Sequence, residues 1–143
     1  EDIDMVDQNC AYCMEGELVA KFGIKICELE TSKVYLFKEQ SHPGRCIVAH
    51  KKHVGDMNEL TAEERAAYFE DVARVARAIM KAFNPDKVNY GAYGDTGHHL
   101  HFHLCPKYKD EYEWGGVFLM NPDKKYLTDA EYAEMIEKIK ANL

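Results

Sequence analysis

Histidines alternate with apolar residues in one short segment of this chain. Residues 98–106 read His-His-Leu-His-Phe-His-Leu-Cys-Pro and hold four of the seven histidines. Successive side chains of a β-strand point to opposite faces, so three imidazoles would share one face while apolar side chains enter a core. The three imidazoles are those of His99, His101 and His103. The segment therefore predicts a strand with a functional face, and His98 falls on the opposite side of it.

The remaining hydrophobic patterns predict an α+β domain. Short runs of β-branched and aromatic residues between turn residues indicate strands. We expect these strands at residues 17–22, 24–29, 33–38, 45–49, 87–93 and 99–106. A capping box of Thr61 with Glu64 opens a long helix over 61–83, and Thr128 with Glu131 opens a C-terminal helix. Strands in runs around one inserted helix favour a mostly antiparallel sheet.

Composition and charge restrict the kind of protein. The chain has the size of one domain, which we expect to span residues 1–143. Its net charge of -7 argues against nucleic-acid binding, which needs a basic surface. No apolar run could span a membrane, and Glu1-Asp2-Ile3-Asp4 lacks the basic and apolar parts of a signal peptide. We therefore expect a cytoplasmic protein whose five cysteines are reduced.

Three imidazoles on one strand face allow three interpretations. They could hold a catalytic zinc ion, which takes three histidine ligands and keeps one open position. One neutral imidazole could attack an electrophile while its neighbours orient it and bind charge. They could also be ordinary polar side chains, an interpretation that suits single histidines better than three in strict alternation. Separately, Cys10 and Cys13 form a C-x-x-C pair, which is half of a four-ligand zinc site.

The histidine segment resembles the His-φ-His-φ-His-φ-φ signature of the histidine triad (HIT) superfamily, where φ is apolar. Residues 99–105 follow this pattern, and Pro106-Lys107 is similar to the Pro-Arg that often comes next. Upstream, residues 43–53 read Pro-Gly-Arg-Cys-Ile-Val-Ala-His-Lys-Lys-His and resemble the family stretch P-G-H-x-x-V-x-P-x-x-H. The resemblance covers residues 10 to about 109 in order and spacing.

This resemblance implies a HIT-like antiparallel sheet of about five strands, with one long helix and a C-terminal helix. It implies a nucleotide hydrolase or transferase that acts at an α-phosphate of a dinucleoside polyphosphate or nucleoside phosphoramidate. His101 would be the nucleophile that forms a nucleotidyl-histidine intermediate, His103 would contact the phosphate, and His99 would support the site. A homodimer is the assembly that the resemblance implies.

The same resemblance implies a structural zinc ion. Some branches hold one with a C-x-x-C pair, an intermediate histidine and the first triad histidine. These positions correspond to Cys10, Cys13, His53 and His99, with His50 as the alternative to His53. Two other functions stay open: a zinc-dependent hydrolase with the triad as metal ligands, and a nucleotide-binding module with little catalysis.

Two departures from the family pattern bear on the substrate. Arg45 stands where the family usually has histidine after the Pro-Gly turn. Asp95 stands in the loop before the triad, where an amide is frequent, and an ionised carboxylate would repel a polyphosphate. We expect substrate contacts from Asp95 and Thr96 in this loop and from Asn89 in the strand before it. The resemblance adds Glu39, which lies near the place where the family often has an acidic residue on the ribose.

Overall fold

The structure is a computed structural model that describes residues 7–143. The first four residues, on which the signal-peptide expectation rests, lie outside this range. Along the chain the elements are α1 (Ala11–Met14), α2 (Gly16–Ala20), β1 (Gly23–Glu28), β2 (Ser32–Phe37), β3 (Cys46–His50), the 3-10 helix η2 (Met57–Glu59), α3 (Ala62–Phe83), β4 (Lys87–Gly91), β5 (His101–Lys107) and α4 (Asp129–Ala141).

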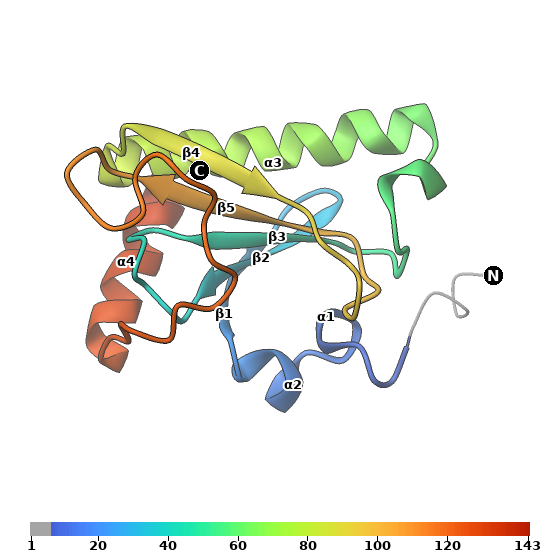
Figure 1. Cartoon of the computed structure of the whole chain (residues 1–143). Coiled ribbons are helices and arrows are strands. Elements are labelled where there is room, and N and C mark those ends of the chain that lie inside the picture. The colour runs from blue at the N-terminus through green and yellow to red at the C-terminus, as the bar shows by residue number, and fades with distance from the viewer. Residues whose placement is uncertain (1–6) are drawn as a thin grey trace.

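The strands form one antiparallel sheet in the order β1-β2-β3-β5-β4 (Figure 1). The histidine strand β5 therefore lies between the central strand β3 and the edge strand β4. In its register His101 pairs with Ala49, and His103 pairs with Ile47 on one side and Gly91 on the other. The predicted α+β fold, with about five antiparallel strands, one long helix and a C-terminal helix, is confirmed.

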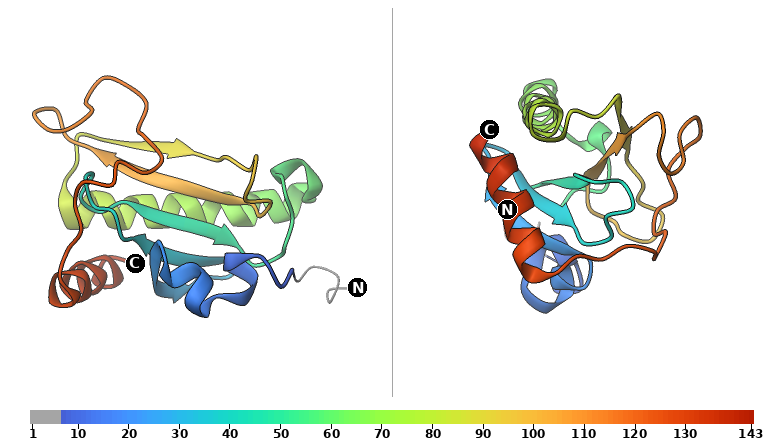
Figure 2. Two further views of the ribbon diagram at one scale, coloured as in Figure 1. Left: turned by 60° about the horizontal axis from the view of Figure 1, so that its bottom comes forward. Right: turned by 90° about the vertical axis from the view of Figure 1, so that its left-hand side faces the viewer.

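Different elements cover the two faces of the sheet. The end-on view in Figure 2 has α3 and α4 on one side and the segment that follows β5 on the other. The α3 and α4 side holds the main core, which includes Val34, Leu36, Cys46, Val48, Val75, Ile79 and Leu104. A smaller cluster on the opposite face joins α1 and α2 to β2 and β3 and includes Tyr12, Val19, Tyr35, Phe37, Ile47 and Ala49. Because paired residues share a face, His101 and His103 lie on this second side.

Both long helices begin as their sequences predict. In α3, the Thr61 hydroxyl accepts from the Glu64 amide, and the Glu64 carboxylate accepts from the Thr61 amide. Thr128 and Glu131 form the same capping box at α4. Within residues 7–143, none of the helices combines the length and apolar character needed to cross a bilayer.

Apart from shifts of one or two residues at strand ends, three features differ from the sequence expectation. The strand predicted at 17–22 is wrong, since this stretch forms α2 and buries Val19 against the sheet. A short apolar run has too few residues for its period to separate helix from strand. Strand β5 begins at His101, because the His99 ring turns toward α1 and its amide donates to Gly97. His98 is exposed in the preceding loop, so its predicted position on the core face of the strand is wrong.

Candidate functional site

A cavity of about 630 Å³ opens on the sheet face that carries the histidines. This volume lies within the usual range for small-ligand sites, roughly 300–1,000 Å³. The cavity walls come from α1, the ends of α2 and β2, the loop before β5 and the segment after it. They include Tyr12, Phe22, Phe37, Tyr93, Asp95, His101, His103, Met120 and Tyr126.

His101 presents one free ring nitrogen to this cavity. Its Nδ1 lies 2.7 Å from the carbonyl oxygen of His99. A carbonyl only accepts, so Nδ1 carries the proton and Nε2 keeps a lone pair. Burial lowers the pKa of His101, and the ring is therefore neutral at neutral pH. Among the described residues, Nε2 has no hydrogen-bond partner, which leaves it available to a ligand in the cavity.

His103 follows on the same face and is 3% exposed. Its Nδ1 lies 3.1 Å from the Nη2 of Arg45, and its ring packs edge-on against Phe37 at 5.5 Å between centroids. Burial, with Arg45 and His101 nearby, lowers the pKa of His103 to about 3. The two neighbouring histidines are thus both neutral, but they have chemically different partners.

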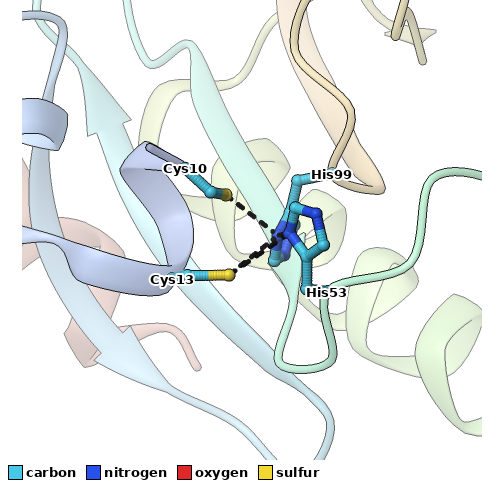
Figure 3. A group of neighbouring side chains, drawn as sticks. All are labelled: Cys10, Cys13, His53 and His99. Carbon is cyan, nitrogen blue, oxygen red and sulfur yellow. Dashed lines mark hydrogen bonds between the residues drawn. The ribbon is translucent and has the colours of Figure 1, made fainter. Parts of the chain in front are cut away.

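The third triad histidine has a different neighbourhood. The His99 ring points away from the cavity toward Cys10 and Cys13 of the α1 segment and His53 of the loop after β3 (Figure 3). Its Nδ1 lies 3.3 Å from the Cys10 sulfur, 3.6 Å from the Cys13 sulfur and 3.0 Å from His53 Nδ1. His53 Nδ1 is also 3.3 Å from the Cys13 sulfur. Four ligand atoms therefore converge on one point.

The spacing of these four atoms fits a metal ion. All lie within 4.8 Å of one another. Around a tetrahedral zinc ion with Zn–N of about 2.0 Å and Zn–S of about 2.3 Å, ligand separations run from about 3.3 Å to about 3.8 Å. The observed N···N and S···N distances of 3.0–3.6 Å are close to this range. Two thiols and two imidazoles are also the donors that suit zinc.

Neighbouring groups orient both imidazoles of this cluster. The Nε2 of His99 lies 2.6 Å from the carbonyl oxygen of His50, so it carries the ring proton and leaves Nδ1 with the lone pair. The Nε2 of His53 lies 3.8 Å from the Asp7 carboxylate. His50 itself is not in the cluster, since its ring packs on Tyr68 and its Nδ1 accepts from the Lys52 amide. Of the two candidates for the third position, His53 is the one that lies in this cluster.

The predicted substrate contacts divide into two groups. Asp95 and Thr96 border the cavity and are exposed. Glu39 also borders it, but its carboxylate accepts from the amides of Ser41, Lys124 and Lys125. This carboxylate therefore anchors the segment before α4. Asn89 pairs with Cys105 further along the sheet and lies outside the cavity lining.

Two residues of the site were not predicted as parts of it. Arg45 is fully buried beside His103, although the sequence marked it only as a departure from a pattern. Tyr12 lies between the two cysteines, and its ring packs against His101 at 4.9 Å and His99 at 5.4 Å between centroids. The sequence could have indicated Tyr12 through its position between Cys10 and Cys13. The segment that carries these cysteines must approach His99 if they share a metal site, and Tyr12 then lies beside the histidine strand.

Comparisons with known proteins agree with this geometry. The HIT domain family matches residues 23–110. The adenosine 5'-monophosphoramidase hnt1 of Schizosaccharomyces pombe is 28% identical over 116 residues, covering 75% of this chain and 80% of the relative. The bis(5'-adenosyl)-triphosphatase of Dictyostelium discoideum is 28% identical over 98 residues and covers 65% of each chain.

Solved structures share the fold. A histidine triad protein of Sinorhizobium meliloti superposes with a TM-score of 0.82 at 23% identity and covers 90% of this chain and 95% of its own. A zinc-bound histidine triad family protein of Mycobacterium smegmatis superposes with a TM-score of 0.65 at 22% identity, covering 93% of this chain and 91% of its own. With the family match over more than half of its length, the chain belongs to the HIT family.

Proposed function

We propose that this protein is a nucleotide hydrolase that cleaves at an α-phosphate through a covalent nucleotidyl-histidine intermediate. The observation that carries the proposal is the hydrogen bond from His101 Nδ1 to the His99 carbonyl oxygen. This bond directs the reactive lone pair of Nε2 away from the backbone, on a neutral ring at the cavity wall. The relatives named as a phosphoramidase and a triphosphatase of adenosine nucleotides support the substrate class.

The reaction balances in two steps. His101 Nε2 attacks the α-phosphorus, a P–N bond forms, and the bond to the leaving group breaks with its electron pair. The imidazolium that forms is stabilised because Nδ1–H already donates to a carbonyl oxygen. The leaving group takes up a proton from solvent. Water then attacks phosphorus and gives up a proton, the P–N bond breaks with its electron pair returning to Nε2, and nucleoside monophosphate leaves as the ring becomes neutral again. His103 contacts the phosphate oxygens, whose charge must be stabilised in both steps.

The cavity lining offers groups for both parts of such a substrate. Tyr12, Phe22 and Phe37 supply aromatic surface for a nucleoside. Asp95 and Thr96, from the loop before β5, also line the cavity. Asp95 disfavours an anionic leaving group beside it, so a phosphoramidate fits this site better than a polyphosphate does.

The direct test is turnover of adenosine 5'-monophosphoramidate and diadenosine triphosphate by wild-type protein and His101→Ala. We expect the substitution to abolish release of adenosine monophosphate, and we expect rapid alkaline denaturation of the wild-type reaction, which preserves the acid-labile P–N bond, to trap adenylate on His101. His98→Ala is the matched control, since His98 is an exposed histidine in the loop before β5. Full activity in His101→Ala would refute the proposal. Tight binding of adenosine monophosphate without turnover would instead indicate a binding module.

We infer that Cys10, Cys13, His53 and His99 hold a structural zinc ion. A zinc ion with these four protein ligands would have no open coordination position, so it would stabilise the fold rather than activate water. A catalytic zinc ion on all three triad histidines does not fit the geometry. The Nδ1 of His99 faces the Cys10 sulfur and its Nε2 donates to the His50 carbonyl oxygen, so neither nitrogen is available on the side of His101 and His103. Metal analysis should find one zinc per chain in wild type and in His101→Ala, and none in Cys10→Ser. Loss of metal in His101→Ala would contradict this assignment.

We infer further that the protein works as a cytoplasmic homodimer. Within residues 7–143 none of the five cysteines forms a disulfide bond, which suits a reducing compartment. Strand β4 forms an edge of the sheet with Tyr90 exposed, and Val117 and Leu119 are exposed in the segment after β5. Such apolar surface is a frequent mark of an interface. Sedimentation equilibrium measures the assembly directly, and a monomer at micromolar concentration would contradict the inference.

A further inference from the structure

Arg45 is a buried cation beside His103 of the catalytic strand β5. Its side chain has no exposed surface, and its guanidinium lies between the rings of Phe37 and Phe118, at 4.1 Å and 4.9 Å from their centroids. The preceding residue, Gly44, has a φ of +95°, and a Cβ there would lie 2.6 Å from the Phe83 ring. The turn before β3 therefore requires glycine at position 44, and Arg45 follows this turn directly.

The hydrogen bonds of this guanidinium reach two elements of the site. Nη1 donates to the carbonyl oxygen of Leu119 at 3.2 Å, and Nη2 donates to that of Met120 at 2.8 Å. Nη2 also lies 3.1 Å from His103 Nδ1. In the described part of the chain no carboxylate lies within ion-pair distance of Arg45. A cation buried without a counter-ion is costly, which argues that its position has a function.

Its chemistry determines the tautomer of His103. A guanidinium has five N–H donors and no acceptor, and it stays charged in proteins. The 3.1 Å contact is therefore a hydrogen bond from Arg45 to the lone pair of His103 Nδ1. With that lone pair occupied, the only proton of a neutral ring must be on Nε2. In His101 the partner of Nδ1 is a carbonyl oxygen, so the proton is on the opposite nitrogen.

We propose that Arg45 is a positioning residue that holds His103 as the Nε2–H tautomer, so that this nitrogen donates to the α-phosphate that His101 attacks. This inference rests on the proposed function. Two histidines on one strand face then have opposite tautomers and opposite tasks: His101 offers a lone pair and His103 offers a proton. The partner of Nδ1 sets each tautomer: the carbonyl oxygen of His99 for His101, and the guanidinium of Arg45 for His103.

The hydrogen bond also strengthens the donor. A charged group that donates to Nδ1 polarises the ring and makes Nε2–H a stronger donor toward an oxyanion. Arg45 would thus act on the phosphate through the neutral ring of His103, while its own guanidinium stays buried. The N–H donor is in place before the reaction, which is the condition for efficient stabilisation of charge in the transition state.

Arg45 has a second, structural role, because the same guanidinium donates to the carbonyl oxygens of residues 119 and 120 and so anchors that segment. The test must distinguish this anchoring from the effect on His103. Lys107 supplies the matched control. It is also a buried cation, 2% exposed, and its Nζ donates to the carbonyl oxygens of Glu113 and Gly116 in the same segment, at 2.6 Å and 2.7 Å. It makes no contact with His103, so Lys107→Met weakens the anchoring of the segment and leaves the His103 partner in place.

The test measures the tautomer directly by ¹⁵N chemical shifts of labelled histidine, with His103 assigned by comparison with His103→Gln. We expect wild type and Lys107→Met to have His103 protonated on Nε2, and Arg45→Met to lose this preference. Arg45→Lys retains an N–H donor and should retain the Nε2–H form in a larger fraction of molecules. An Nδ1–H signal for His103 in the wild-type protein would overturn the proposal, even if Arg45→Met fails to fold.

Kinetics supply the second readout, with adenosine 5'-monophosphoramidate as the substrate. We expect Arg45→Met to lower kcat by about 100-fold or more, the usual effect of losing one oxyanion donor, with a much smaller change in KM. Arg45→Lys should recover part of kcat, and Lys107→Met should change kcat little. Equal losses of kcat in Arg45→Met and Lys107→Met would overturn the proposal in favour of segment anchoring. The NMR result stands independently of whether His101→Ala is active, so the two proposals fail separately.

Discussion

The buried, neutral state of His103 makes the stability of this protein depend on pH. Burial is the main reason that the pKa of this ring falls to about 3, and the titratable groups that face it are Arg45 and His101. In the unfolded chain a histidine has a pKa of ~6.5. Between these two values the unfolded state binds a proton that the folded state does not bind. The free energy of unfolding is therefore highest above pH ~6.5 and falls as the pH is lowered toward the folded value.

The size of this effect follows from the unfolded state alone. Between about pH 7.5 and about pH 5, protonation of one histidine of pKa ~6.5 stabilises the unfolded chain by ~2 kcal/mol. Any folded pKa below about 4 gives the same result, because the folded ring stays neutral over this interval. Other buried histidines with lowered pKa values, among them His42 and His50, add to the total in wild type.

Comparison with His103→Gln isolates the contribution of this one ring. The glutamine oxygen can accept from Arg45 in place of Nδ1 but does not titrate. Urea denaturation of both proteins at the two pH values gives four free energies of unfolding. The variant should lose ~2 kcal/mol less than wild type on acidification, since the other histidines are common to both. An equal loss in the two proteins would refute a buried neutral His103.

Three further predictions concern the metal cluster and the cavity. Cys13→Ser should release bound zinc and lower the melting temperature, as measured by metal analysis and calorimetry. Asp95→Asn should raise kcat/KM for diadenosine triphosphate ~5-fold, which corresponds to the ~1 kcal/mol of one exposed charge pair at 4 Å, and should change phosphoramidate turnover less. Tyr12→Ala should retain zinc but lower kcat by up to ~10-fold, because an aromatic contact of ~0.5–1.5 kcal/mol orients the His101 ring.

The sequence predicts those parts of the site that depend on local periodicity. Alternation places His101 and His103 on one face whatever the neighbouring strands are, and the structure agrees. The role of Arg45 depends instead on the register between β3 and β5, which puts the residue two before Ile47 next to His103. A one-residue shift would turn Arg45 to the opposite face, and because β3 is buried on both faces its hydrophobic pattern does not select between the two registers.

Long-range backbone contacts set a second limit. Glu39 looks like a free carboxylate near a strand end, but the amides of Lys124 and Lys125 occupy it. Such partners have no side-chain signature, and they lie beyond the part of the chain that resembles the HIT pattern. The short helix α2 shows the same limit at a smaller scale, since tertiary packing of Val19 decides its conformation.

His99 connects the metal cluster to the nucleophile through two different atoms. Its ring nitrogen Nδ1 faces Cys10 and Cys13, while its carbonyl oxygen accepts the bond that fixes the tautomer of His101. The α1 segment that carries the cysteines also carries Tyr12, which packs on the His101 ring. A bound zinc ion would therefore hold both the hydrogen-bond partner and the packing partner of the nucleophile, without contacting the substrate. Loss of the metal should consequently lower kcat as well as thermal stability, whereas a purely structural cluster remote from the site would affect stability alone.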